Sequence, residues 1–88
     1  MTWSVTLGKN AAKQFKRLPP NLQGFVLKRL QEMRADPFSG DVIALKGKQW
    51  KGRYRKRVGR YRIIFLLHSA EHIVEISAIL LRNKSTYR

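Results

Sequence analysis

Residues 54–65 read YRKRVGRYRIIF: a basic stretch turns at a glycine and continues directly into an apolar one. Nine of the seventeen residues from Lys46 to Arg62 are Lys or Arg, and none is acidic. Ile63 to Leu67 is apolar throughout, as in a buried strand. Because the basic stretch is joined to residues that must be buried, we expect its side chains to hold fixed positions. Fixed arginines suit phosphate binding better than a mobile basic tail does.

The composition describes a single basic domain over residues 1–88. Its apolar content of 43% is sufficient for a core, and the absence of cysteine excludes disulfides and thiolate zinc sites. The net charge of +14 favours a polyanionic partner, with nucleic acid first, an acidic protein second and a membrane surface third. Residues 1–7 do not resemble a signal peptide, and no apolar run is long enough to cross a bilayer. We therefore expect a cytoplasmic protein.

The apolar spacing predicts an α+β domain. A half-buried strand covers residues 2–7, a helix follows from about residue 11 and ends at Pro19-Pro20, and a second helix begins at Pro20 or Asn21 and closes at Asp36-Pro37. Residues 38–47 are a predicted loop. Three further strands are expected at residues 50–58, 61–68 and 72–80. The predicted fold is an N-terminal strand, a helical hairpin and a three-stranded meander, with the helices on one face of an antiparallel sheet.

Strand alternation places several arginines together. Arg53, Arg55 and Arg57 share one face of their strand, because side chains alternate between the two faces. A two-residue turn at Gly59-Arg60, or at Val58-Gly59, puts Arg62 on that same face. A three-residue turn would break this arrangement. The alternative interpretation is a solvated hairpin whose arginines spread into water.

The aromatic residues of the basic stretch have two interpretations. Trp50, Tyr54 and Tyr61 could stack on bases, as aromatics of RNA-binding proteins do. For Tyr61 we favour packing against the core, and for Trp50 both interpretations stay open.

With these motifs in place, the chain resembles the RelE/ParE superfamily of bacterial and archaeal type II toxins, on the RelE side. The resemblance rests on Ala12-Lys13 through Leu18-Pro19, Asp36-Pro37, Leu45-Lys46-Gly47, the motif at residues 54–65, and a last strand leading to Arg82 and Tyr87. It covers nearly the whole chain. The motif at residues 54–65 is the most specific part.

The resemblance implies an mRNA endoribonuclease that acts in the ribosomal A site, inhibits translation and is neutralised by an antitoxin. By position, the catalytic set is Arg55, Arg57, Arg62, Arg82 and Tyr87. Relatives often have an aspartate where this chain has Arg60. Some relatives carry a catalytic histidine or glutamate that has no clear counterpart here, and we expect His68 and His72 to be turn residues.

The chemistry that the resemblance implies is attack of the RNA 2′-hydroxyl on the neighbouring phosphate. We expect Arg62 and Arg82 to stabilise the phosphorane, Arg55 and Arg57 to hold the phosphate, and Tyr87 to accept the 2′ proton. The general acid stays open between Arg57, Lys56 and a group of the ribosome. The five acidic residues show no metal-ligand spacing, so neither a metal nor another cofactor is expected.

Further basic residues are predicted to contact RNA: Lys46, Lys48, Lys51, Arg53, Lys56 and Arg60. For the lysines, a solvated surface is the alternative. The basic outer faces of both helices suit ribosomal RNA or an antitoxin that is acidic in part. Two other functions stay open: a ParE-like inhibitor of DNA gyrase, and an RNA-binding module without catalysis.

Overall fold

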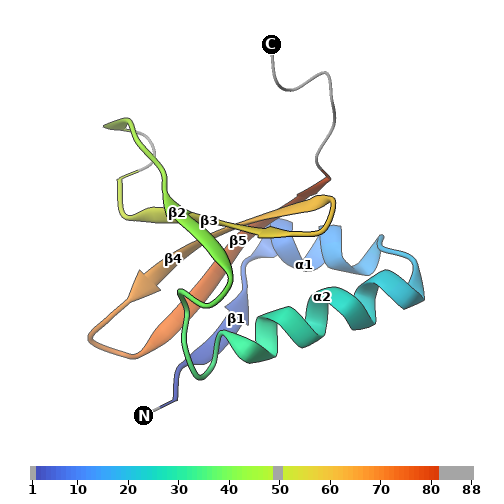
Figure 1. Ribbon diagram of the computed structural model, residues 1–88, viewed down its shortest axis with the longest axis horizontal. Helices are drawn as coiled ribbons and strands as arrows, with labels where there is room; N and C mark the ends of the chain where they lie inside the picture. Colours follow the sequence, from blue (N-terminus) through green and yellow to red (C-terminus); the bar gives the residue numbers. More distant parts are fainter. Residues whose placement is uncertain (1, 49–50, 82–88) are drawn as a thin grey trace.

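The computed structural model describes residues 2–48 and 51–81, and seven helices and strands follow one another there. They are β1 (Ser4–Leu7), α1 (Lys9–Lys16), α2 (Pro20–Glu32), β2 (Asp41–Ala44), β3 (Arg53–Val58), β4 (Tyr61–His68) and β5 (Ile73–Leu81) (Figure 1). This confirms the predicted α+β order of a strand, a helical hairpin and a meander. None of the helices in this part of the chain is long and apolar enough to cross a membrane.

The strands form one sheet in the order β1-β5-β4-β3-β2. β3, β4 and β5 are antiparallel neighbours, as the predicted meander requires. At the opposite edge, however, β1 runs parallel to β5, with Ser4 opposite Ile73 and Leu7 opposite Ile76. The prediction of a purely antiparallel sheet is wrong at this edge. A parallel pair needs a long connection between its strands, and the chain from α1 to β4 provides it.

The loop predicted for residues 38–47 contains a strand. Asp41 lies opposite Arg57 of β3 and Ala44 opposite Tyr54, in antiparallel register. Val42 is half-buried while its three strand neighbours are exposed, so the segment shows little of the apolar alternation typical of strands. Backbone pairing with β3 stabilises this edge strand. The sequence of residues 41–44 does not predict that pairing.

Short hydrogen bonds join β5 to α1 and to the residue just before it. The Gly8 amide, just before the helix, donates to the Ile76 carbonyl at 2.7 Å. Farther along β5, where β1 has ended, the Ile79 amide donates to the Gln14 side-chain oxygen at 2.6 Å. Gln14 thus satisfies a strand amide that would otherwise lack a partner at the sheet edge.

One boundary of the helical hairpin, the start of α2, lies at a proline. α1 ends at Lys16, and α2 begins at Pro20, as predicted. Proline is tolerated there because the first helical residue has no intrahelical use for its N–H. α2 ends at Glu32, before the predicted boundary at Asp36. Between them the chain makes a turn in which the Met33 amide donates to the Leu30 carbonyl at 3.1 Å.

Both helices pack on one face of the sheet (Figure 1). The buried core comprises Ala11 of α1, Val26 and Leu30 of α2, Met33, and Val58, Ile63, Phe65, Val74, Ile76 and Ile79 of the strands. All the strand members point to the helix side of the sheet. The opposite face of the sheet is therefore left without a covering layer in the described residues.

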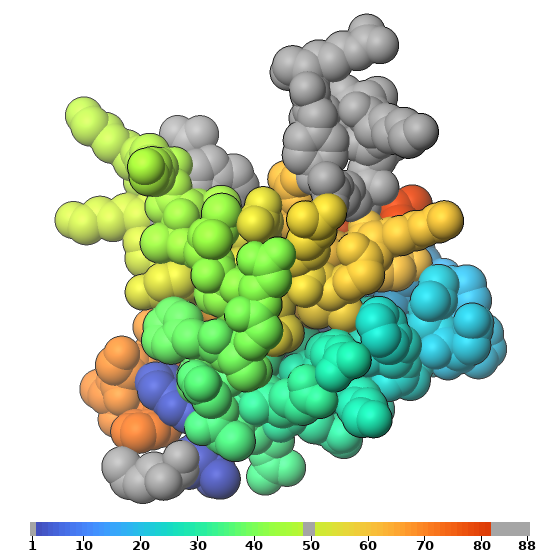
Figure 2. Space-filling model, in the orientation of Figure 1, coloured from blue at the N-terminus to red at the C-terminus, as the bar shows by residue number. Residues whose placement is uncertain are grey.

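The turn between β3 and β4 lies against α2 (Figure 2). It consists of Gly59 and Arg60, and Gly59 has a φ of +57°. A positive φ at the first turn position is typical of a type II′ hairpin turn, whose twist matches that of the strands. A Cβ at this position would approach the Phe25 ring to 3.3 Å. Glycine is therefore favoured twice, by backbone conformation and by space.

We predict that Gly59→Ala destabilises the protein by roughly 1–2 kcal/mol, the usual cost of a left-handed residue with a side chain. The matched control is Gly24→Ala inside α2, where a Cβ meets nothing within 4 Å. That substitution should stabilise by about 0.5–1 kcal/mol, because alanine is the better helix former. Urea unfolding measures both free energies. Equal stability of Gly59→Ala and wild type would contradict the role assigned to the turn.

Candidate active site

Four arginines lie together on the open face of the sheet. The two-residue turn pairs Arg57 of β3 with Arg62 of β4. Because side chains alternate along each strand, Arg53 and Arg55 lie on the same face as this pair. The helices cover the other face, so these residues define an open "arginine face". The shared face predicted for the four arginines is confirmed.

Like charges meet directly in one cross-strand row of this face. Arg57 lies between Asp41 on β2 and Arg62 on β4. The row thus contains one carboxylate and two guanidinium groups, and its net charge is positive. Directly opposed like charges destabilise a sheet by about 0.2–1 kcal/mol. An anion bound on this face would turn that repulsion into attraction.

Arg55 is half-buried in the next row, between Ile43 of β2 and Ile64 of β4. Its Nε is buried and has no hydrogen-bond partner among residues 2–48 and 51–81. A buried donor without a partner typically costs about 1–3 kcal/mol.

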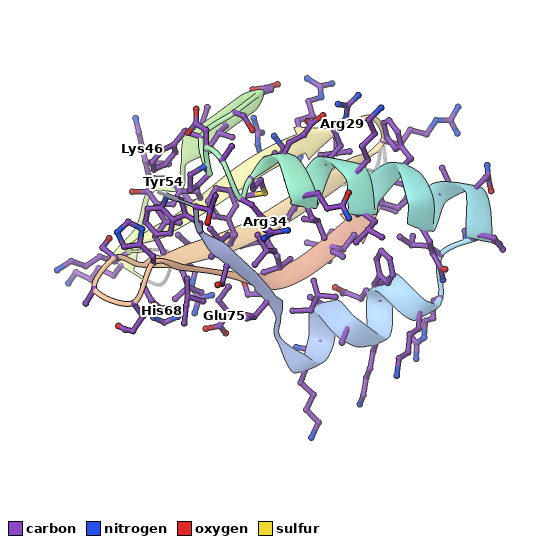
Figure 3. The ribbon with its side chains drawn as sticks, turned by 90° about the horizontal axis from the view of Figure 1, so that it is seen from below. Arg29, Arg34, Lys46, Tyr54, His68 and Glu75 are labelled. Carbon is purple, nitrogen blue, oxygen red and sulfur yellow. The ribbon has the colours of Figure 1, made fainter. Side chains whose placement is uncertain are left out.

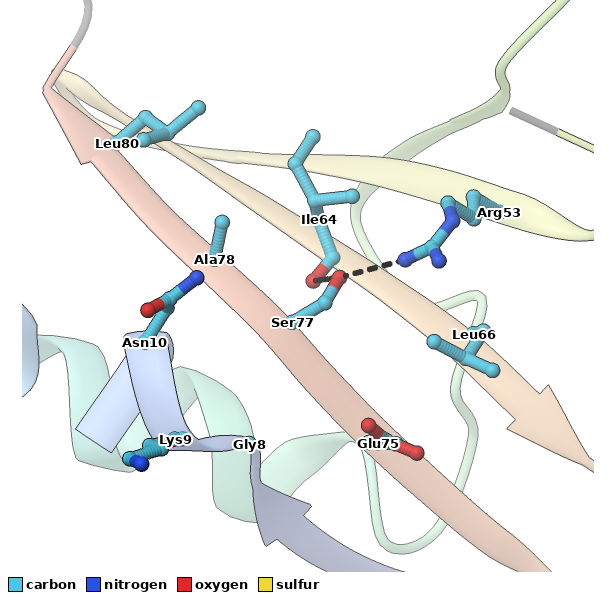
Figure 4. Close-up of a pocket in the computed structure, with 10 residues that line it drawn as sticks. All are labelled: Gly8, Lys9, Asn10, Arg53, Ile64, Leu66, Glu75, Ser77, Ala78 and Leu80. Atoms are coloured by element: carbon cyan, nitrogen blue, oxygen red, sulfur yellow. Dashed lines mark hydrogen bonds between the residues drawn. The ribbon is translucent and has the colours of Figure 1, made fainter. Parts of the chain in front are cut away.

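The Arg53 side chain extends across the sheet to β5 instead of pointing into solvent. Its guanidinium donates to the Ser77 hydroxyl of β5 at 3.3 Å, and that hydroxyl donates to the Ile64 carbonyl at 3.1 Å (Figure 4). Ser77 lies at a β-bulge, since Ile64 pairs with Ala78 while the next residue of β4 pairs with Ile76. The bulge lets a serine of β5 reach an arginine two strands away.

Lys56 does not belong to this face, which contradicts the RNA contact predicted for it. It is 3% exposed on the helix side of β3, and its ammonium donates to the Ser39 carbonyl. Burial lowers the pKa of Lys56 from its ordinary value of 10.5, and the nearby Glu32 carboxylate partly opposes that shift. A buried ammonium bound to a carbonyl cannot reach RNA, and the same position removes Lys56 as the general acid.

The other residues predicted to contact RNA lie at the two ends of the hairpin. Lys46, Lys48 and Lys51 are exposed in the segment before β3, at the end of the sheet where β4 finishes. Arg60 is exposed in the turn at the opposite end. The Tyr54 ring stacks on Phe65 at 5.5 Å on the core side, and Tyr61 packs against the core as favoured.

Arg82 and Tyr87 lie outside the described residues, as does Trp50. β5 ends at Leu81, one residue after Leu80, which lies opposite Arg62. β5 therefore ends beside the arginine pair. The roles predicted for Arg82 and Tyr87 stay predictions.

Two carboxylates on the arginine face were missed by sequence reasoning. Asp41 was assigned to a loop, and only the structure pairs it with Arg57. Glu75 of β5 lies opposite Leu66 of β4, after the bulge has shifted the register. The short apolar stretch at residues 42–44, directly after Asp41, is a weak signal for the first. We find no sequence signal that locates the bulge.

A histidine accompanies Glu75. His68 is the last residue of β4, rather than the simple turn residue expected, and its Nε2 lies 2.8 Å from Glu75 Oε1 (Figure 3). His72 does lie in the turn, with a φ of +55° and its ring 4.6 Å from that of Trp3. Within residues 2–48 and 51–81, no group of three His, Cys, Asp or Glu side chains could hold a metal ion.

The fold has clear relatives among solved structures. A chain of the toxin–antitoxin complex RelBE2 from Mycobacterium tuberculosis superposes with a TM-score of 0.83 at 19% identity, covering 93% of this chain and 100% of that one. A chain of the archaeal RelE–RelB complex from Pyrococcus horikoshii gives 0.78 at 26% identity, covering 96% and 99%. The YoeB/ParE toxin from Agrobacterium tumefaciens gives 0.76 at 13%, covering 91% and 99%.

These similarities confirm the resemblance to the RelE/ParE superfamily. They were found by structure: no protein-family profile matches the chain, and no curated protein matches it. At these identities the shared property is the fold, while the arrangement of arginines on it belongs to this chain.

We predict that Lys56 makes stability depend on pH. Since its pKa in the folded protein lies below the ordinary 10.5, the unfolded chain binds more protons between those two values. The free energy of unfolding of wild type should therefore rise with pH in that window, relative to Lys56→Met. The control is Lys51→Met, which removes an exposed lysine. Urea unfolding from neutral pH to 10.5 tests this. The same pH dependence in both variants would mean that the Lys56 ammonium is not desolvated.

Proposed function

We propose that this chain, which has the fold of the RelE/ParE toxins, is the toxin of a toxin–antitoxin pair and cuts mRNA in the ribosomal A site, stopping translation. The observation that carries the proposal is the convergence of Arg55, Arg57 and Arg62 on one open sheet face. Ribosomes are cytoplasmic, so the site of action is the cytoplasm.

The positions of these arginines favour catalysis over loose binding. Guanidinium groups fixed on adjacent strands can meet several oxygens of one phosphate at once. Stabilising the charge that develops on a phosphorane needs donors that are already in place. Arg57 and Arg62 are opposed in register, and Arg55 lies in the next cross-strand row of the same face. These adjacent guanidinium groups repel one another when no anion is bound, and they can stabilise the negative charge of a phosphorane.

The proposed reaction uses RNA itself as the nucleophile. The 2′ oxygen attacks phosphorus, the bond from phosphorus to the 5′ oxygen breaks, and the products are a 2′,3′-cyclic phosphate and a 5′-hydroxyl. Arg55 and Arg57 hold the phosphate, while Arg62 and Arg82 stabilise the phosphorane. Tyr87 accepts the 2′ proton. With Lys56 buried, Arg57 or a group of the ribosome delivers the proton to the 5′ oxygen.

The positive charge of the chain favours binding to two kinds of partner, RNA and an acidic protein. With a net charge of +14, association with ribosomal RNA and with message is electrostatically favoured. An antitoxin that is acidic in part would relieve the same repulsion and, by covering the arginine face, would exclude RNA. Of the solved relatives, the one from M. tuberculosis is a toxin–antitoxin complex and the one from P. horikoshii is a RelE–RelB complex.

We predict that Arg62→Ala lowers the rate of cutting of ribosome-bound message by about 10²–10³, the usual effect of removing one transition-state donor. Primer extension on purified programmed ribosomes measures the rate. The matched control is Arg34→Ala, an exposed arginine beyond the end of α2, which should cut at the wild-type rate. Wild-type cutting by Arg62→Ala would refute the assignment of the site.

The variant Tyr87→Phe tests the proposed proton acceptor independently of the arginines. We expect a strong loss of cutting with unchanged binding to ribosomes, because only the proton acceptor is removed. Full activity of Tyr87→Phe would remove Tyr87 from the mechanism and leave the arginines in place.

Two assays distinguish the remaining functions. Inhibition of gyrase supercoiling with intact messages would identify a ParE-like toxin. Salt-dependent RNA binding without cutting would identify a binding module, since its affinity falls with the number of phosphates neutralised.

A further inference from the structure

A hollow of about 590 Å³ opens on the arginine face beside the proposed catalytic residues (Figure 4). It lies over β5 and β4, between Arg53 on one side and the first residues of α1 on the other. Leu80 lines one end and lies opposite Arg62, so the hollow adjoins the arginine pair. Its volume is within the ~300–1,000 Å³ typical of ligand sites.

The floor of the hollow is apolar. Ile64 and Leu66 of β4 and Ala78 of β5 form it, and the small Ala78 side chain leaves depth above the strand. Flat apolar floors suit the faces of planar rings, which lose little by leaving water. A nucleobase is the planar ring that an RNA strand bound at the arginines would bring.

The apolar floor lies between a positively charged side chain, Arg53, and a negatively charged one, Glu75. Arg53 of β3, Leu66 of β4 and Glu75 of β5 lie in one cross-strand row, so Arg53 and Glu75 are separated by two strand spacings, roughly 10 Å. Both are held in place: the Arg53 guanidinium by Ser77 at 3.3 Å, and Glu75 Oε1 by His68 at 2.8 Å. Glu75 Oε2 lies on the α1 side, 3.6 Å from where a Cβ on Gly8 would be.

We propose that this hollow binds the base of a nucleotide next to the cut bond, and that Glu75 and Arg53 read its edge and favour guanine. This inference rests on the proposed function. A carboxylate in the hollow repels phosphate, so the base enters it while the arginines beyond Leu80 hold the backbone. The catalytic set and the specificity site are thus neighbouring but separate parts of one face.

The preference for guanine follows from the polar atoms available. A carboxylate only accepts hydrogen bonds, and guanine presents two adjacent donors, its N1–H and N2–H₂. Arg53 only donates, and it matches the acceptors O6 and N7 at the other side of the same base. Adenine and uracil each have one donor beside an acceptor on the corresponding edge, so one carboxylate oxygen would face an acceptor and be repelled.

The test uses purified full-length protein on ribosomes carrying messages that differ only in the base on either side of the cut. Wild type should cut messages with guanine at one of these positions about ten-fold faster than those with uracil, as expected for a base read by paired hydrogen bonds. Glu75→Gln should lose most of that preference, because the amide also offers a donor. The matched control Glu71→Gln removes the same charge from the exposed turn before β5 and should keep the wild-type preference.

The outcomes separate this inference from the proposed function. An unchanged base preference in Glu75→Gln, with cutting intact, overturns the base-reading role alone. Absence of cutting by wild type overturns the proposed function. A second measurement needs no variant: GMP titrated into the isotope-labelled protein should shift the amide signals of Asn10 and Ala78 more than UMP does. Equal shifts with the two nucleotides would also overturn the inference.

Discussion

The two-residue turn between β3 and β4 is the constraint on which the site depends. Gly59, with its positive φ, lets the strands reverse without an extra residue, and this sets Arg57 opposite Arg62. A slip of one residue in β3 would exchange its two faces, placing Arg55 and Arg57 in the core and Lys56 outside. Core and site are therefore specified by the same register.

The two faces of the sheet contribute oppositely to stability: one packs against the helices, and the other brings like charges together. Among the described residues, the helix side buries one charged side chain, Lys56, whose ammonium is bound to the Ser39 carbonyl. The other side gathers guanidinium groups that repel one another across strands. In many proteins a functional site places groups together that destabilise the fold locally, here like charges on neighbouring strands. Packing elsewhere in the fold then offsets the lost stability. Phe65 and Ile63, both fully buried, provide it on β4, the strand that also carries Arg62.

Irregular features divide the open face into parts. β1 ends at Leu7, so α1 begins beside the middle of β5 and forms a wall there. The bulge at Ser77 gives Arg53 a partner and brings Glu75 opposite Leu66. Without these interruptions, and above all without the bulge, the register of β5 would shift by one residue and Glu75 would lie on the helix side. With them, a positive end suited to phosphate adjoins a hollow suited to a base.

The sequence by itself determined the α+β order, the start of the second helix at Pro20 and the common face of Arg53, Arg55, Arg57 and Arg62. Those features follow from local periodicity and from turn chemistry, which a single segment contains. Only the tertiary structure decided that β1 is parallel to β5, that residues 41–44 form a strand, that Lys56 is buried, and that Glu75 joins the arginine face. These depend on pairing between segments far apart in the chain, and on one bulge, because register and burial are properties of the partners together.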